Sequence, residues 1–202
     1  MLPRRSVLLL PFFVGFAPAV SAARPRDIGT FPVAVFVADE GGRPAASEEW
    51  IDAQLARAEV LYAQLGIRFK RVSFSLIDAA HAHLVTRSDR DALVKFRKQE
   101  VINVFVVASL KDVDEKDTFR RGVHWRPAAT PTKRFIILSV AAGPTVLAHE
   151  LGHYFGNPHT TTVNNLMSYT RTNENVFLDA AQIARTTGVA RSVLQSGEVK
   201  GI

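Results

Sequence analysis

Apolar residues follow two different spacings along the chain, and together these spacings predict a mixed arrangement of strands and helices. Four stretches are rich in β-branched and aromatic residues and are bounded by Gly, Pro or charged positions, which is typical of strands. These stretches span residues 31–38, 67–77, 101–110 and 135–140. The third is apolar at nearly every position and therefore predicts a strand buried on both faces. A shorter strand is predicted over 122–126, ended by Pro127.

Between the first two strands, apolar residues recur every three or four positions, which indicates an amphipathic helix. Ser47 can cap this helix, which should run to about Leu65, and Gly66 suits the C′ position that ends it. A shorter helix is predicted after the second strand, with Ser88 as its cap and Asp91 completing a variant capping box.

Two further helices are predicted in the second half of the chain. Gly143 and Pro144 open the first of them, with Pro144 at the first helical position. Asp179 and Gln182 form a capping box for a final helix over about 180–194. Strands mixed with helices place the chain in the α/β (α+β) class, with the sheet in the N-terminal part.

The length and the beginning of the chain indicate one exported domain. The chain has 202 residues, of which 47% are hydrophobic, enough for a sizeable core in a single domain. Arg4 and Arg5 precede an apolar run over 7–19, and a small-x-small pattern follows. This layout predicts a signal peptide at 1–22 and a catalytic domain at 23–202. We therefore expect a secreted or periplasmic protein, exported by Sec or Tat, without a stable membrane anchor after cleavage; an uncleaved anchor is the alternative.

Charge and cysteine content narrow the range of partners. Lys and Arg number 25 against 19 acidic residues, a formal net charge of +6, but no long basic run with interleaved aromatics is present. Nucleic-acid binding is therefore not expected. The chain has no cysteine, so that disulfides cannot stabilise it and no thiolate can bind an active-site metal. A monomer is expected.

The segment from His149 to His159 reads H-E-x-x-H-x-x-G-x-x-H. Four residues advance a helix by about 400° and about 6 Å, so that His149 and His153 share one face and can bind one cation. Glu150 is rotated by about 100° and can reach the open side of the metal without binding it. Imidazole nitrogens in this spacing are typical ligands of zinc.

The end of the motif predicts a third ligand. Gly156 tolerates the left-handed conformation that ends a helix, and Pro158 discourages further helix. The reversed chain can then bring His159 to the same metal. Three protein ligands leave the fourth position of zinc for water, which marks a catalytic site. Zinc lowers the pKa of this water and Glu150 can act as its general base.

The motif resembles that of the metzincin superfamily of zinc endopeptidases. Asn165-Leu166-Met167-Ser168-Tyr169 is similar to the methionine turn of that family, with Met167 beneath the metal. The resemblance implies a twisted mixed sheet of about five strands with long helices, a zinc-binding helix, and a small C-terminal subdomain with the Met-turn and final helix. It also implies that Tyr169 binds zinc and stabilises the transition state, as in some members; a packed aromatic is the alternative.

The subfamily indicated by these residues is mixed. The short step from His159 to Met167 is matrixin-like, whereas Met-Ser-Tyr is more similar to serralysins. The charged loop at 111–121 has no histidine, so that the second zinc of matrixins is not expected. Its acidic residues could bind calcium, but a solvated loop is favoured. His81 and His83 are interpreted as surface residues rather than ligands.

The sequence therefore predicts a secreted zinc metalloendopeptidase that acts on protein or peptide substrates. The catalytic residues would be Glu150 and Tyr169, and the metal ligands His149, His153 and His159. The short strand that carries His124 and Trp125 would be an exposed sheet edge bordering the cleft, and a covered edge with a packed Trp is the alternative. Two alternatives stay open: a zinc hydrolase acting on a non-protein amide such as a cell-wall peptide link, and a non-catalytic binding module with a metzincin fold.

Overall fold

A computed structural model describes residues 27–172 and 175–202 of the chain. The predicted signal peptide at 1–22 lies outside the described residues. Within the described part, none of the helices is both long enough and apolar enough to span a bilayer.

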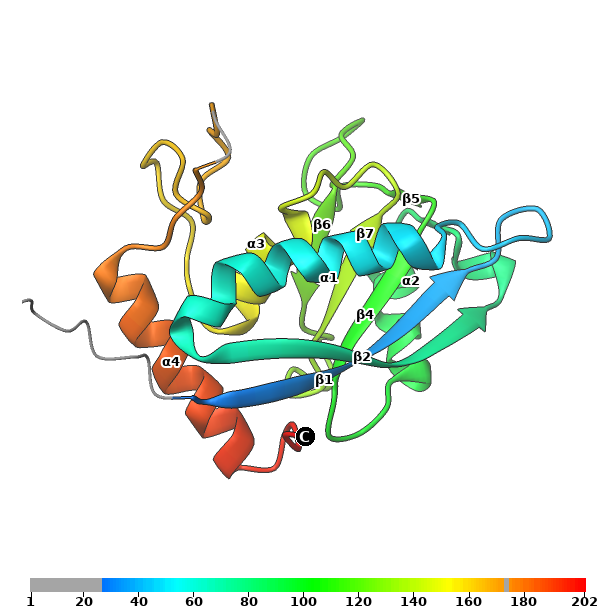
Figure 1. Cartoon of the computed structure of the whole chain (residues 1–202). Coiled ribbons are helices and arrows are strands. Elements are labelled where there is room, and N and C mark those ends of the chain that lie inside the picture. The colour runs from blue at the N-terminus through cyan, green and yellow to red at the C-terminus, as the bar shows by residue number, and fades with distance from the viewer. Residues whose placement is uncertain (1–26, 173–174) are drawn as a thin grey trace, which may run out of the picture.

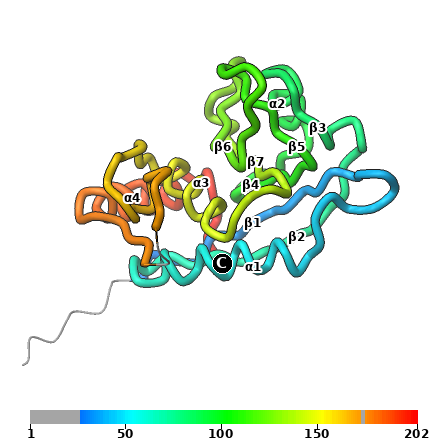
Figure 2. Tube along the Cα trace, turned by 90° about the horizontal axis from the view of Figure 1, so that it is seen from above, coloured from blue at the N-terminus to red at the C-terminus, as the bar shows by residue number. Residues whose placement is uncertain are grey.

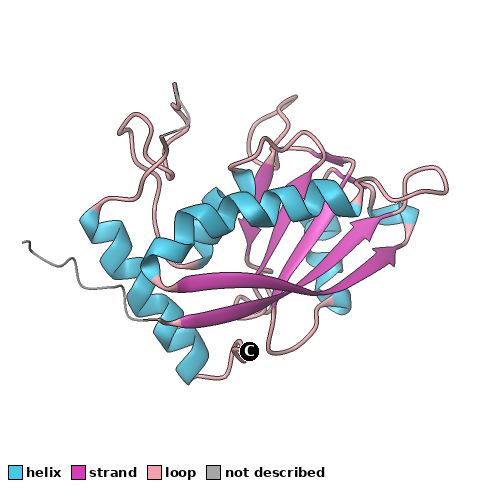
Figure 3. Ribbon diagram, in the orientation of Figure 1, coloured by secondary structure: helices cyan, strands magenta, loops and turns pink. Residues whose placement is uncertain are grey.

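A five-stranded sheet with the order β2-β1-β4-β7-β6 forms the centre of the fold (Figures 1 and 3). Its strands are β1 (Gly29–Ala38), β2 (Ile67–Ile77), β4 (Ile102–Val107), β6 (Gly122–Trp125) and β7 (Phe135–Ser139). Four strands are parallel, and β6 runs antiparallel to β7 at one edge. The predicted twisted, mixed sheet of about five strands is confirmed.

The burial of each strand follows its apolar pattern. β4 and β7 are buried at every position, as their nearly continuous apolar runs require, because side chains cover both faces of the sheet. β2 is an edge strand that is exposed at several positions. The predicted strand over 101–110 divides into β4 and β5 (Ser109–Leu110), and β5 leaves the sheet to pair with β3 (His83–Leu84). The prediction of one continuous strand was wrong at this point.

Helix α1 (Glu48–Tyr62) crosses one face of the sheet, and α2 (Arg87–Ala92) lies on the other (Figure 2). Ser47 caps α1 by accepting a hydrogen bond from the backbone N–H of Trp50, as predicted. The short 3₁₀ helix η1 (Ala63–Leu65) follows, and Gly66 ends it with a φ of 73°. The left-handed conformation is the one that glycine adopts without a steric cost.

The predicted cap of α2 was wrong. Thr86 occupies the N-cap position with extended backbone, and Asp89 completes the capping box. The two residues proposed from the sequence lie two positions further along, inside the helix. Asp91 instead accepts a hydrogen bond from the indole of Trp125 on β6, at 2.7 Å. A contact between distant segments thus determines the orientation of that carboxylate.

Helix α3 (Val146–Tyr154) begins two residues after Pro144 rather than at it. Thr145 precedes the first helical residue and its hydroxyl does not cap the helix. Gln54 of α1 takes this role, because its side chain donates to Gly143 O at 3.1 Å and accepts from the N–H of Leu147 at 3.4 Å. The start of α3 is therefore fixed to α1.

The final helix α4 (Ala180–Gln195) has the predicted capping box between Asp179 and Gln182. It lies beside α3 at one end of the molecule, whereas α2 and β5 lie at the other end (Figure 2). One core cluster fills the space between the sheet and helices α1, α3 and α4, and a second lies under α2. Tyr62 joins α1 to α3 by donating a hydrogen bond to Ala148 O at 2.9 Å. α3, the helix that carries the motif, is thus packed against both the sheet and α1.

Candidate metal centre

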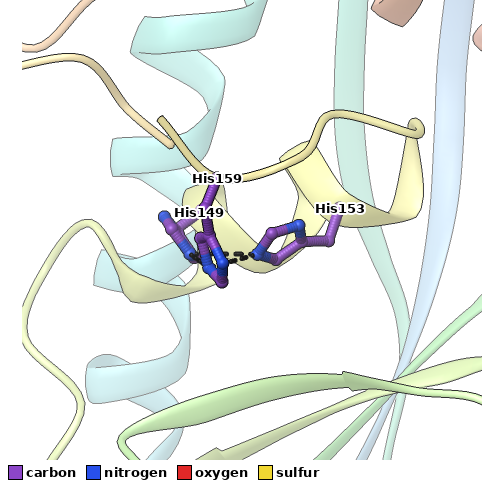
Figure 4. A group of neighbouring side chains, drawn as sticks. All are labelled: His149, His153 and His159. Carbon is purple, nitrogen blue, oxygen red and sulfur yellow. Dashed lines mark hydrogen bonds between the residues drawn. The ribbon is translucent and has the colours of Figure 1, made fainter. Parts of the chain in front are cut away.

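Three histidine side chains converge, two from α3 and one from the segment that follows it (Figure 4). The Nε2 atoms of His149 and His153 lie 3.2 Å apart, one helical turn from each other. The Nε2 atom of His159 lies 3.3 Å from that of His149 and 2.9 Å from that of His153. Among residues 27–172 and 175–202 these are the one group of three that could share a metal ion. The structure brings together all three ligands predicted from the sequence.

A helix-ending motif brings His159 back to the other two histidines. Gly156 has a φ of 87°, in the left-handed region. The N–H of Asn157 donates to Gly152 O at 2.9 Å, and the N–H of Gly156 donates to His153 O at 3.0 Å. This pair of hydrogen bonds is the Schellman motif, which satisfies the last carbonyls of the helix and reverses the chain.

The orientation of the imidazoles indicates a cation. The Nδ1 atom of His149 bonds to Leu166 O at 2.7 Å, and that of His153 bonds to Asn157 O at 2.8 Å. A carbonyl only accepts, so that each Nδ1 must carry the proton and each Nε2 must present a lone pair. These lone pairs point at one another and at His159, an arrangement that repels unless a cation lies between them. Three neutral imidazoles, two of them with the outer nitrogen held by a carbonyl, fit a zinc ion.

The pKa values of the three histidines also favour metal binding. Burial lowers the pKa of His149 to about 4, and it also lowers the pKa of His153. Burial lowers the pKa of the more exposed His159 as well. All three rings are therefore favoured in the neutral form that binds metals.

The methionine turn fixes the orientation of His149. Asn165 Oδ1 accepts a hydrogen bond from the N–H of Met167 at 2.8 Å, which closes the turn whose carbonyl at Leu166 holds His149. Gln182 of α4 exchanges two side-chain hydrogen bonds with Asn165, at 2.8 and 3.1 Å. Gln182, which belongs to the capping box of α4, thus also holds the methionine turn in place.

Met167 is fully buried and lies directly against Gly152 on α3. A Cβ atom added at Gly152 would lie 2.3 Å from Met167 Sδ, well inside van der Waals contact. The close approach of the turn to the helix therefore requires glycine at this position.

Replacing Gly152 with Ala is expected to lower the free energy of unfolding by about 1–3 kcal/mol, the usual cost of overpacking a core. Gly188 on α4 is a matched control, because it is exposed and a Cβ added there meets no atom within 4 Å. Gly188→Ala should stabilise the protein by about 0.5–1 kcal/mol. Urea unfolding of both variants measures the difference; equal effects would contradict the assigned contact.

Glu150 lies next to the histidines with its carboxylate buried. Burial raises its pKa to about 8, although the backbone N–H of His124 donates to it and Arg120 and Arg171 oppose the shift. β6 passes very close: a Cβ added at Gly122 would lie 3.0 Å from Glu150 Oε1. A glycine at that point of the edge strand leaves room for the carboxylate, a role that the sequence analysis did not assign.

Tyr169 lies beside the cluster and is 67% exposed. Its ring centroid lies 4.6 Å from that of His159 and 6.0 Å from that of His149. The ring is thus largely exposed and contacts the rings of two predicted ligands. Arg120 forms a hydrogen bond with Tyr169 and also pairs with the buried carboxylate of Asp112. These contacts link Tyr169 to the loop before β6.

The other residues considered as ligands have different contacts. Asp112 also accepts hydrogen bonds from the N–H groups of Asp114 and Glu115. His81 packs against Phe96, and the Nδ1 atom of His83 bonds to Ser109 Oγ. In the part of the chain that the structure describes, neither set forms a second group suited to a metal.

A cleft of about 1130 Å³ lies in front of the histidines, and β6 borders it. Among the described residues, β6 pairs with β7 alone, and on its other edge the N–H of His124 donates to Glu150. His124 and Trp125 line the cleft. The ring of His124 packs edge-on against Tyr154 at 5.7 Å. Arg90 lies over the ring of Trp125, with its guanidinium 4.8 Å from the ring centroid. Both side chains therefore have defined positions at the border of the cleft.

No protein-family model and no curated protein sequence matches the chain. Solved structures do match it. Mature mirolysin of Tannerella forsythia, in complex with a cleaved peptide, is 13% identical with a TM-score of 0.61, covering 83% of this chain and 96% of that one. Archaemetzincin from Methanopyrus kandleri is 17% identical with a TM-score of 0.53, covering 85% and 98%.

Metalloproteinase-II from Bacteroides fragilis is 16% identical with a TM-score of 0.55. The match covers 80% of this chain and 53% of that one, so that this chain spans about half of the length of that protein. These neighbours are metzincin-type metalloproteases, and the likeness shows that this chain has their fold. At such low identity the likeness does not extend to a subfamily, and the matrixin-like assignment stays a prediction.

Proposed function

We propose that the protein is a zinc-dependent endopeptidase that hydrolyses peptide bonds in proteins or peptides. The observation that carries the proposal is the convergence of three Nε2 atoms within 3.3 Å, next to a buried glutamate in an open cleft. The metzincin fold supports it, as does a neighbour whose structure contains a cleaved peptide. All these residues belong to one chain, so that a monomer is sufficient for activity.

His149, His153 and His159 would hold the zinc, which supplies Lewis-acid polarisation of a carbonyl and acidifies water. Glu150 acts as general base: it accepts a proton from the attacking water and passes it to the leaving amine. The backbone N–H of His124 holds the carboxylate in place during these transfers. Tyr169 projects beside His159, where its hydroxyl donates to the oxyanion that develops on the substrate.

The edge of β6 that does not pair with β7 is the proposed site for the substrate backbone. An extended peptide can add to an exposed edge by main-chain hydrogen bonds, which gives affinity for many sequences. Gly122 and His124 lie on this strand next to Glu150, so that the added peptide passes the catalytic carboxylate. This arrangement favours cleavage within a chain over removal of terminal residues.

The test is to purify the chain, count zinc per molecule and follow cleavage of a quenched random peptide library with and without a chelator. We expect about one zinc per chain, with cleavage abolished by the chelator and restored by added zinc. Purified peptidoglycan serves as the parallel substrate. Cleavage of peptidoglycan alone would replace the endopeptidase by a cell-wall hydrolase, and a folded protein without zinc would overturn the proposal.

We further propose that residues 1–22 are an export signal and that 23–202 form the single catalytic domain of a secreted or periplasmic protein. The basic start and apolar run support the signal. The two core clusters share one sheet, because both contain residues of β1, β4 and β7, which supports one domain. The amino-terminal residue of the exported protein would identify the cleavage site.

A further inference from the structure

Arg171 lies in the wall of the cleft, two residues after Tyr169 and on the segment that leaves the methionine turn. Its Nη1 donates a hydrogen bond to Thr145 Oγ1 at 2.9 Å, just before the first residue of α3. The hydroxyl of Thr145 thus bonds Arg171 and does not cap the helix. The guanidinium is thus held at a fixed position beside the catalytic centre.

Two guanidinium groups act on the carboxylate of Glu150, those of Arg120 and Arg171. Arg120 forms an ion pair with Asp112, whose side chain is 2% exposed. Arg171 forms no ion pair with any residue of 27–172 or 175–202. Its charge therefore faces the cleft without a dedicated counter-ion other than the more distant Glu150.

This position is electrostatically unfavourable for a cation. Burial lowers the pKa of Arg171, and the attraction of Glu150 only partly opposes this effect. The start of a helix carries a partial positive charge, which repels a guanidinium. A zinc ion bound to His149 and its partners would add further positive charge. An arginine held here costs stability, and an incoming anion would offset that cost.

We propose that Arg171 selects peptides that carry an aspartate or glutamate side chain next to the scissile bond. The inference rests on the proposed endopeptidase function and names the substrate class for that site. A guanidinium has five N–H donors, of which one bonds Thr145, so that enough remain for a carboxylate. The planar fork of arginine matches a carboxylate with two parallel hydrogen bonds, a geometry that lysine does not reproduce.

A competing explanation is that Arg171 only balances the charge of Glu150. In that case its removal would lower kcat by the same factor on every peptide. Selection of an acidic substrate instead predicts that the loss is confined to acidic peptides. The ratio of kcat/KM between acidic and neutral substrates separates the two explanations, because a general effect on Glu150 cancels in the ratio.

The test uses pairs of quenched peptides that are identical except for Asp or Asn at each position flanking the scissile bond. We expect the wild-type protein to prefer Asp at one of these positions by about tenfold or more, the range of charge-assisted hydrogen bonds. Arg171→Gln should reduce this ratio to about one, and Arg171→Lys should restore part of it. Arg126→Gln, which removes another arginine of the cleft, should change the ratio much less.

A binding measurement separates the role of Arg171 from the endopeptidase function. The Asp and Asn peptides are titrated into zinc-loaded Glu150→Gln protein with and without the Arg171→Gln substitution, so that no turnover is needed. Tighter binding of the Asp peptide that depends on Arg171 supports the inference even if the wild-type protein cleaves nothing, which would overturn only the endopeptidase function. Cleavage of both peptides with equal kcat/KM, or equal binding, overturns the role of Arg171 and leaves the function standing.

Discussion

Glu150→Gln is expected to leave zinc binding intact and to reduce peptide cleavage by about 10²–10⁴-fold in kcat, the usual contribution of a general base. The amide cannot accept the proton of water, but it keeps the shape of the side chain and can still accept the hydrogen bond from the N–H of His124. The three histidines are unchanged, so that the metal stays in place. Zinc content and kcat measured on the same preparation give the result.

The folded state should tolerate this substitution well. Glu150 is buried, and placing a charged group in a buried site is costly unless it is fully paired. Burial raises the pKa of this carboxyl to about 8, so that near neutral pH the metal-free wild type holds it largely as the neutral acid. The amide is likewise neutral, and the metal-free variant should therefore unfold no more easily than the wild type. Glu115→Gln is the control, because Glu115 lines the same cleft from the charged loop. Substantial turnover by a homogeneous Glu150→Gln preparation would refute the role of Glu150 as general base.

The metal centre could be predicted from the sequence because its geometry is local. The separation of four residues between His149 and His153 fixes their distance once a helix forms, and Gly156 encodes the reversal that returns His159. The strands were predictable for a similar reason, since β4 and β7 are apolar at nearly every position. In each case the information lies within about ten consecutive residues.

Features that depend on distant segments could not be read in this way. Gln54 caps the start of α3 from α1, about ninety residues away in the chain, so that the helix begins at Val146 and not at Pro144. Gly122 appeared only as part of a short strand, because its contact with Glu150 exists only after the sheet has packed on the helix. The position of Arg171 beside Thr145 is likewise a product of the tertiary fold.

Helix α4 combines a local sequence signal, its capping box, with contacts to segments that are distant in the chain. Its capping residue Gln182 holds Asn165 in the methionine turn, and Thr186 accepts a hydrogen bond from Asn157 Nδ2 at 2.7 Å. Asn165 and Asn157 belong to the two turns whose carbonyls hold His149 and His153. α4 contributes none of the predicted ligands. Its side chains nevertheless hold the two turns whose carbonyls accept hydrogen bonds from His149 and His153. Such outer contacts tune the affinity of a metal site.

His159→Ala is expected to weaken zinc binding more than about 100-fold, beyond the range seen when outer partners of a ligand are lost, and to abolish peptidase activity. His159 is the only one of the three predicted ligands that does not belong to α3. Removing it leaves two ligands on the helix, which hold zinc poorly because the ion prefers at least three protein donors in catalytic sites. The affinity is measured by competition with a chelator of known zinc affinity.

The metal-free fold should survive this substitution, because His159 is exposed and its removal relieves the close approach of three Nε2 atoms. The thermal stabilisation that zinc gives to the wild type should disappear in the variant, since only a tightly bound ligand shifts the unfolding equilibrium. His124→Gln is the control: this histidine lines the same cleft but does not belong to the cluster, so that its loss should leave zinc binding nearly unchanged. If His159→Ala retained wild-type zinc affinity while His124→Gln lost it, the metal would be bound by a different set of residues, and the proposed mechanism would fail with the site.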